Sequence, residues 1–357
     1  MIKNIKLQGF RNFKRGEYEF GPEITVIVGP NASGKTNLLE SLFLLSTGKS
    51  FKAKIEEEMV NYEKDIARVV GVLPDSLTLE AIVTRGQIDI GTDRPEKAPR
   101  KRLLVNGVPK RMIDFAGNFK VVLFGPWDMD LVTESPSIRR RFLDTVLSQI
   151  DREYRRSALS YEKGLRQRNR VLLDIREGNI GRDRLLFWDQ LLIKNGDYIT
   201  KKRREFIEFV NSHHSLSINT YSLIYDSSII SEGRLEQYKE EEVAAATTLV
   251  GPHRDDFIFN KAERNLSSYG SRGEQRMGVL WLKMAELDYI ENIGIEAGAE
   301  INSARPTLLL DDIFSELDGE HKDIVMDIAT RQQTIITSVD DEFTKDLKDV
   351  EKIELVS

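Results

Sequence analysis

The residues best suited to chemistry near the start of the chain form a glycine-rich segment between two regular patterns. The segment consists of Gly29, Pro30, Asn31, Ala32, Ser33, Gly34, Lys35 and Thr36. It follows a β-branched run over 24–28 and precedes a helical pattern over 37–45, which is the setting in which GxxxxGK[ST] binds phosphate. Glycines let backbone N–H groups face phosphate oxygens, and the start of the helix adds a favourable dipole. We expect Lys35 to reach the β- and γ-phosphates of ATP and the Thr36 hydroxyl to ligate Mg²⁺.

A second candidate lies at the end of an apolar run, Pro306 to Asp312 (PTLLLDD). A carboxylate at the end of a strand beside a phosphate-binding loop can hold Mg²⁺, and a second acid can polarise the attacking water. We therefore assign Asp311 to the metal and Asp312 to the water. Without the glycine-rich segment, the same residues would indicate an Asp-rich turn or a helix cap.

A third candidate is the segment 271–276, Ser-Arg-Gly-Glu-Gln-Arg, which precedes an amphipathic helix. A serine at the start of a helix can bind an anion. Ser271 and Glu274 also fit the S-x-x-E pattern of a capping box, so the segment has both a functional and a structural interpretation.

The elements that must position these residues fall into two groups. Strand patterns over 1–7, 77–84, 102–105 and 119–124, with the apolar run before Asp311, predict an α/β fold with a mixed, partly antiparallel sheet. Between them, Ser135-Pro136 begins a pattern that predicts one long amphipathic helix to about residue 171, followed by a second from about 182 to 210. We therefore predict one lobe from 1–126 plus 246–357 and an inserted helical lobe over 127–245.

Composition excludes several classes of protein. The 357 residues have room for two domains, and the formal net charge of −6 excludes a uniformly basic nucleic-acid coat protein. The absence of cysteine excludes disulfide scaffolds and Cys-based metal sites. No apolar run approaches the ~18 residues of a membrane span, and the charged N-terminus is unlike a signal peptide, so we expect a cytoplasmic protein.

One segment departs from the acidic average. Residues 139–170 hold ten Lys and Arg against four acids. Arginines spread around a helix usually form a solvated face with local ion pairs. They can also bind DNA phosphates, and for that role we single out Arg152, Arg155, Arg156 and Arg166.

The order of the motifs resembles the ATPase heads of the ABC superfamily. A phosphate-binding loop is followed by S-x-G-x-Q before a helix, then by an apolar strand ending in two acids, and then by 315–318 (SELD), which matches the superfamily's D-loop. In that superfamily the S-x-G-x-Q signature binds the γ-phosphate of ATP held by the opposite subunit. The resemblance implies that Ser271 is catalytic together with Lys35 and Asp312. It also implies nucleotide contacts by Arg11, Asn12, Asn37, Gly273, Glu274 and Gln275.

Within the superfamily, the chain resembles the RecF family of DNA repair proteins. The matching segments run in order: 7–13 (LQGFRNF), 37–40, 105–107, 123–144 (LFGPWDMDLVTESPSIRRRFLD), 250–256 (VGPHRDD) and 309–318. The resemblance implies a weak DNA-stimulated ATPase that dimerises on ATP and binds double-stranded or gapped DNA. It further implies action with RecR and RecO in loading RecA at gapped or stalled replication sites.

Two other members of the superfamily are alternatives. A transporter nucleotide-binding subunit has its signature much nearer the loop than the 236 residues that separate Lys35 from Ser271, and a chromosome-maintenance ATPase carries far longer heptad arms than 127–235 allows.

The chain also departs from the patterns expected of the family at two places. Gly125 and Trp127 replace an expected Ser and Glu, and no His follows the strand 334–337, so we expect Thr337 or Ser338 in the position of the switch His.

Overall fold

The computed structural model describes residues 1–88, 96–212, 220–315, 319–339 and 350–356. The chain divides into two compact units, Met1–Pro126 with Ile290–Ser357, and Trp127–Tyr289. No helix in the described ranges combines the length and the apolar character that crossing a membrane requires.

The chain re-enters the first unit at Ile290, which is later than the predicted residue 246. The reason is strand β11 (Tyr221–Asp226), which the sequence analysis missed. It pairs antiparallel with β12 (Asp256–Lys261) over six residue pairs, from Tyr221 opposite Lys261 to Asp226 opposite Asp256. These hydrogen bonds keep the segment after 246 with the helices that precede it, and the short strand β13 (Arg264–Asn265) completes the sheet.

The first unit contains a six-stranded antiparallel sheet in the order β2-β1-β4-β5-β8-β9. Its strands are β1 (Asn4–Phe10), β2 (Phe13–Glu19), β4 (Ile66–Val72), β5 (Thr78–Thr84), β8 (Lys101–Val105) and β9 (Val108–Lys110). A separate short hairpin joins β6 (Gln87–Ile88) to β7 (Glu96–Lys97).

The same unit contains a five-stranded parallel sheet in the order β10-β14-β15-β3-β16. Its strands are β3 (Ile24–Val28), β10 (Val121–Phe124), β14 (Thr307–Asp311), β15 (Thr334–Ser338) and β16 (Val350–Glu354). Every residue of the internal strands β14 and β15 is buried, as expected for parallel strands covered on both faces, and so is every residue of the edge strand β10. The short helices of this unit are α2 (Met112–Phe115), α11 (Ile301–Ala304) and α12 (Gly319–Ala329). The predicted α/β class with parallel and antiparallel strands is confirmed, and in this unit the two kinds of strand form two separate sheets where the sequence analysis expected one mixed sheet.

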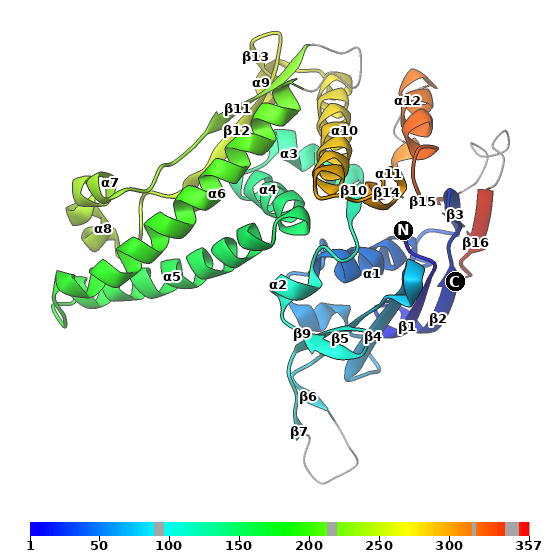
Figure 1. Ribbon diagram of the computed structural model, residues 1–357, viewed down its shortest axis with the longest axis horizontal. Helices are drawn as coiled ribbons and strands as arrows, with labels where there is room; N and C mark the ends of the chain where they lie inside the picture. The colour runs from blue at the N-terminus through cyan, green and yellow to red at the C-terminus, as the bar shows by residue number, and fades with distance from the viewer. Residues whose placement is uncertain (89–95, 213–219, 316–318, 340–349, 357) are drawn as a thin grey trace. The chain divides into compact units, whose positions relative to one another are not determined.

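Helix α1 (Lys35–Thr47) contacts strands of both sheets in the first unit, including β4, β5, β14 and β15 (Figure 1). All of its residues except Thr36 and Asn37 are buried, including the polar Glu40, Ser41 and Ser46, so the core surrounds the helix on nearly every side. Gly71 of β4 makes the close approach possible, because a Cβ there would lie 2.5 Å from Leu45 Cδ1. The core of the unit therefore fixes the helix that the glycine-rich segment enters.

The second unit is mainly helical. Its helices are α3 (Asp130–Thr133), α4 (Pro136–Ile150), α5 (Arg152–Arg176), α6 (Leu186–Ser212), α7 (Glu232–Gln237), α8 (Lys239–Ala245), α9 (Leu266–Tyr269) and, up to Tyr289, α10 (Arg272–Glu296). Helices α5 and α6 run side by side as a long hairpin (Figure 1).

The single long helix predicted from residue 136 to about 171 is wrong, because the chain leaves helical geometry at Asp151. This residue has φ −121° and ψ 110°, and its carboxylate accepts a hydrogen bond from the Tyr154 N–H at 2.9 Å. The Tyr198 hydroxyl donates to its other oxygen at 2.8 Å. Asp151 thus ends α4 and caps α5.

Several arginines of the basic segment and its surroundings are structural. Arg203 is buried and forms ion pairs with Asp144 at 2.8 Å and with Asp255 at 2.9 Å. Arg139 contacts both carboxylate oxygens of Asp256. Arg168, also from the basic segment, is buried against carboxylates of α6 and α8. Because such buried cations need their partners, much of the local positive charge is neutralised inside the unit.

One buried group in this unit carries an excess of negative charge. Lys283 of α10 lies 3.2 Å from a carboxylate oxygen of Asp128 and 3.2 Å from one of Glu286. All three residues are buried, and the ammonium group lies 4.9 Å from the centre of the Phe142 ring. Burial raises the pKa of Glu286 to about 7, with Lys283 opposing the shift.

We predict that this group makes stability depend on pH. A carboxyl whose pKa is about 7 in the folded chain and 4.5 unfolded binds its proton more tightly when folded. The free energy of unfolding should therefore fall as the pH rises from about 4.5 to about 7. Glu286→Gln removes the titrating charge, so it should flatten this dependence and be more stable than wild type above pH 7. Urea unfolding across this range measures both effects, with the exposed Glu296→Gln of the same helix as the control. Equal slopes for wild type and Glu286→Gln would contradict the prediction.

Candidate functional site

The order of the parallel sheet brings three strand ends together. In the register, Thr337 of β15 lies opposite Ile27 of β3 on one side and opposite Asp311 of β14 on the other. The carboxyl ends of parallel strands share one edge, so the segment 29–36, here called the phosphate loop, follows β3 at the edge where Asp311 ends β14. Thr36 of the phosphate loop and Asp311 are 275 positions apart in the sequence, and they are in contact in the fold.

The phosphate loop needs glycine at two places. Gly34 has φ 108°, and a Cβ there would lie 2.6 Å from Asn12 Nδ2. A Cβ on Gly29 would lie 2.7 Å from Ser33 Oγ. The loop therefore closes tightly, in a conformation that ordinary side chains would strain.

The polar groups of the loop point into it. Lys35 is 8% exposed, and its ammonium group donates to the carbonyls of Gly29 at 2.6 Å and Pro30 at 3.1 Å. The Ser33 hydroxyl is buried and finds no hydrogen-bond partner in the described part of the chain. A buried hydroxyl of this kind is a fitting donor for a phosphate oxygen.

Asp311 lies between two hydroxyl groups. Its carboxylate accepts from Thr36 Oγ1 at 2.8 Å and from Thr337 Oγ1 at 2.6 Å. Burial raises its pKa, while these two hydrogen bonds act in the opposite direction. A carboxylate beside a hydroxyl at the start of a helix is an oxygen ligand set that fits Mg²⁺.

Asp312 follows in a strained turn. Its φ of 50° is unusual for a residue other than glycine. Its N–H donates to the carbonyl of Thr337 at 3.2 Å and to the hydroxyl of Thr337 at 3.1 Å. Thr337, one of the two residues expected in the position of the switch His, therefore fixes both acids, and the other, Ser338, pairs with Val28 in the sheet. The sequence signalled a hydroxyl at this position without indicating that it joins the two acids.

A polar layer extends from the loop. Asn12 donates to the Ser33 carbonyl at 3.0 Å and accepts from Asn37 at 2.9 Å. Arg11 forms a two-pronged contact with the buried Glu40, at 2.6 and 2.7 Å. The sequence analysis missed this role of Glu40, since a glutamate in an apolar helix carries no motif of its own.

The segment 271–276, here called the signature turn, belongs to the second unit and forms the capping box. The Ser271 N–H donates to Glu274 Oε2 at 2.8 Å, and the Glu274 N–H donates to Ser271 Oγ at 3.3 Å. Gln275 is buried, and its amide donates to the Leu266 carbonyl at 3.2 Å. A Cβ on Gly273 would meet nothing within 4 Å, so the turn is open at that residue.

The four arginines singled out for DNA lie on α5. The Arg156 and Arg166 side chains are 57% and 64% exposed, and each pairs with a glutamate one turn away on the same helix. Arg155 donates to the Ser148 carbonyl at 2.5 Å, and Arg152 is exposed. The predicted D-loop is outside the described residues from 316 to 318.

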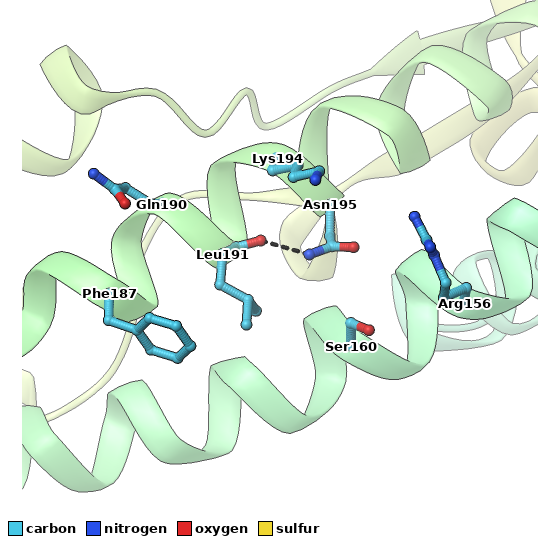
Figure 2. A pocket seen from close by; sticks show the side chains of 7 residues that line it. All are labelled: Arg156, Ser160, Phe187, Gln190, Leu191, Lys194 and Asn195. Atoms are coloured by element: carbon cyan, nitrogen blue, oxygen red, sulfur yellow. Dashed lines mark hydrogen bonds between the residues drawn. The ribbon is translucent and has the colours of Figure 1, made fainter.

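A pocket between α5 and α6 includes one of these arginines (Figure 2). It is lined by Arg156, Ser160, Phe187, Gln190, Leu191, Lys194 and Asn195. Two cationic side chains thus share a surface with Phe187, a phenylalanine that is 64% exposed.

Known proteins resemble the chain over its full length. The family model of the RecF/RecN/SMC N terminal domain matches residues 1–357. The DNA replication and repair protein RecF of Agathobacter rectalis is 35% identical over 366 aligned positions, which cover 99% of this chain and 96% of that protein. RecF of Herpetosiphon aurantiacus is 34% identical, with 96% and 94% covered.

Solved structures agree with this relationship. A structure of the recombination mediator protein RecF-ATP in the RecFOR pathway matches with a TM-score of 0.84 at 30% identity, over 99% of this chain and 95% of that one. An Smc head domain from Pyrococcus furiosus matches with a TM-score of 0.51 at 14% identity, which shows a shared fold alone. With a phosphate loop, two acids at the neighbouring strand end and relatives that match from end to end, the chain belongs to the RecF family of DNA replication and repair proteins.

Proposed function

We propose that this protein is an ATP-dependent DNA-binding recombination mediator that dimerises on ATP and hydrolyses it to ADP. In this proposal it acts on double-stranded or gapped DNA at stalled replication sites, and it helps to load RecA together with RecR and RecO. The observation that carries the proposal is the contact of Thr36 with Asp311 at 2.8 Å beside the phosphate loop. The likeness to a RecF structure with ATP supports the choice of nucleotide.

In this proposal, the phosphate loop of the first unit holds the triphosphate. Backbone N–H groups of the loop, to which Pro30 contributes none, and the Ser33 hydroxyl face its oxygens, and Lys35 exchanges its loop carbonyls for the β- and γ-phosphates. Asn12 and Asn37 keep the rim of the loop in place, and Arg11 is held next to it by Glu40. Thr36 and Asp311 would hold Mg²⁺, which neutralises charge on the phosphates when bound.

Asp312 is the proposed base that orients and deprotonates the attacking water. Its position is supported by the strained φ and by the two hydrogen bonds from its N–H to Thr337. Strain of this kind persists only where the surrounding structure holds it, and it is frequent at active sites. Thr337 is then a positioning residue for both acids.

The signature turn is the proposed contact to ATP bound by a second copy of the chain. Ser271 and Gly273 are exposed at the start of a 25-residue helix, with Glu274 and the buried Gln275 completing the turn. The first unit supplies the phosphate loop and the second unit the signature turn, so two copies together form two composite sites. The two compact units would accordingly be the working lobes of the ATPase.

Four arginines of α5, three of them exposed and Arg155 half-buried, are the proposed DNA contact. Arg152, Arg155, Arg156 and Arg166 belong to one helix, and the pocket beside Arg156 adds Lys194 and an exposed aromatic ring. Cations next to an aromatic surface suit the phosphates and bases of nucleic acid. The buried arginines 139, 168 and 203 are already paired and are left out of this surface.

Asp312→Asn should retain ATP and the dimer while turnover falls by roughly 10²-fold or more, as expected when a general base is lost. Asparagine tolerates a positive φ, so the turn should persist. Sedimentation with ATP and Mg²⁺ should then show a longer-lived dimer, and phosphate release should be slow. The exposed Asp323→Asn on α12 is the matched control. Normal hydrolysis by Asp312→Asn would transfer the role of the base to another residue.

Mixing two inactive variants tests the composite site. Lys35→Ala should lose nucleotide binding because it removes the charge that faces the phosphates. Ser271→Arg should bind ATP but remain monomeric, because a bulky cation blocks the signature turn. A mixture of the two holds one complete site per heterodimer and should recover part of the ATP-dependent association and turnover.

Each variant alone, at the same total concentration, is the control for this mixture. If Ser271 is only a helix cap, Ser271→Arg should cost ~1 kcal/mol of stability and still dimerise. Absence of recovery at every mixing ratio, with both variants folded, would exclude a site formed between subunits.

DNA binding should weaken steeply with salt, with log K falling by ~0.9 per log unit of salt for each phosphate neutralised. Replacing Arg152, Arg155 and Arg156 by glutamine should flatten this slope and leave ATP binding intact. The same number of charges removed at Lys201, Arg204 and Lys239, all exposed in the same unit, is the control. Fluorescence anisotropy on a duplex across a salt series measures the slopes, and an unchanged slope in the α5 variant would place the DNA site elsewhere.

A further inference from the structure

The signature turn carries its own anion. Glu274 Oε2 accepts from the Ser271 N–H at 2.8 Å and from the Ser271 hydroxyl at 3.0 Å. Its other oxygen, Oε1, accepts from the ammonium group of Lys261 at 2.8 Å. Both side chains of this ion pair are about one-third exposed, at 34% for Lys261 and 38% for Glu274. The turn, the carboxylate and the lysine thus form one connected cluster at the surface.

Lys261 comes from a different element and is held in place. It is the last residue of β12, and its ammonium group lies 5.7 Å from the centre of the Tyr221 ring. The Tyr221 hydroxyl in turn donates to the Glu274 carbonyl at 2.9 Å. The sheet of the second unit therefore sets the position of the lysine relative to the start of α10.

The Glu274 carboxylate is ionised at neutral pH. The hydrogen bond from Lys261, followed by those from Ser271, lowers the pKa of Glu274 to about 2. A full negative charge consequently lies against the hydroxyl and the N–H of Ser271. These are donors that a phosphate oxygen would need at the same turn, and two anions cannot both take them without repulsion.

We propose that Glu274 acts as an internal anion that competes with the γ-phosphate of the second subunit for Ser271, and that Lys261 positions Glu274 and limits this competition. This inference rests on the proposed function and deepens it, because it names what regulates the composite site. It gives Glu274 the role of a competitor in place of the nucleotide contact implied by the resemblance. Lys261 binds one oxygen of the Glu274 carboxylate and offsets its negative charge. The γ-phosphate then has to displace a carboxylate whose charge is already neutralised.

A simple helix cap does not account for the cluster. A capping box needs an acceptor at the third helical position, and a glutamine there serves as well as a glutamate. It needs no cation from a neighbouring strand. The Lys261 contact therefore points to the charge of Glu274, and not only to its hydrogen bonds, as the feature that matters.

Three variants separate charge from capping. Glu274→Gln keeps an acceptor for the Ser271 N–H and removes the negative charge. Lys261→Gln leaves the carboxylate without its counter-charge, and the double variant removes both charges. Glu236→Gln is the matched control, because it removes the carboxylate of another Lys–Glu pair, with Lys239, from the same unit.

The measurement is the dimer dissociation constant in ATP and Mg²⁺, from sedimentation velocity over a dilution series, with nucleotide affinity and thermal unfolding measured in parallel. We expect Glu274→Gln to tighten association about 5- to 10-fold and Lys261→Gln to weaken it by a similar factor. The double variant should resemble Glu274→Gln, and Glu236→Gln should match wild type. Nucleotide affinity should stay constant, because the phosphate loop is unchanged.

Equal dissociation constants for wild type and the three variants would overturn the inference and leave the ATP-dependent dimer standing. Weaker association of Glu274→Gln would overturn it as well, since the carboxylate would then assist the contact. If wild type and all variants remain monomeric with ATP bound, the proposed dimer itself is wrong and the inference falls with it.

Discussion

The candidate nucleotide site depends on one buried carboxylate. Asp311 is 3% exposed, and it joins Thr36, at the start of α1, to Thr337, at the end of β15. A carboxylate in this position costs free energy unless hydroxyl or N–H donors compensate for its lost hydration. The two threonines supply this compensation, and in doing so they link the ends of β14 and β15 to the start of α1. The position of Asp312 depends on the same threonine, because its N–H donates to the hydroxyl of Thr337.

In the second unit the buried charges that need partners are positive instead of negative. The ten cations of its basic segment, which lie on α4 and α5, would repel one another if all of them faced solvent, and the fold buries some of them against acids. Arg139 pairs with Asp256, while Arg168 pairs with Asp189 and Glu242. The segment 250–256 matters for this reason: Asp255 and Asp256 balance cations of α4 and α6, among them Arg203. The positive charge that remains exposed is smaller than the sequence suggests, and under the proposed function this leaves a few side chains of α5 as the DNA contacts.

Local patterns predicted the elements whose signal lies within a few residues. The glycine-rich segment, the apolar strands 24–28 and 306–311 and the start of α10 are of this kind, because steric freedom, burial and capping act over one or two turns. Most of the features that the sequence analysis missed depend on distant partners, and the helix break at Asp151 does so only in part. Asp151 breaks the long helix through a local cap, supported by Tyr198 on α6, and β11 forms because β12 pairs with it. Thr337 and Glu40 became meaningful only through Asp311 and Arg11, which are 26 and 29 residues away along the chain.

The phosphate loop and the signature turn, which the proposed function assigns to ATP, each contain a charged side chain that is bound by groups of the same turn. In the phosphate loop, a cation, Lys35, is bound by the carbonyls of Gly29 and Pro30. In the signature turn, an anion, Glu274, is bound by Ser271. Under the proposed function, the triphosphate replaces an internal partner at each turn, so its net contribution is the difference between two sets of charge-assisted hydrogen bonds. One neighbouring charge can shift the difference between two such sets of hydrogen bonds, and in the inference drawn above that charge is Lys261, which lies on a separate strand and influences how tightly two chains associate around the nucleotide.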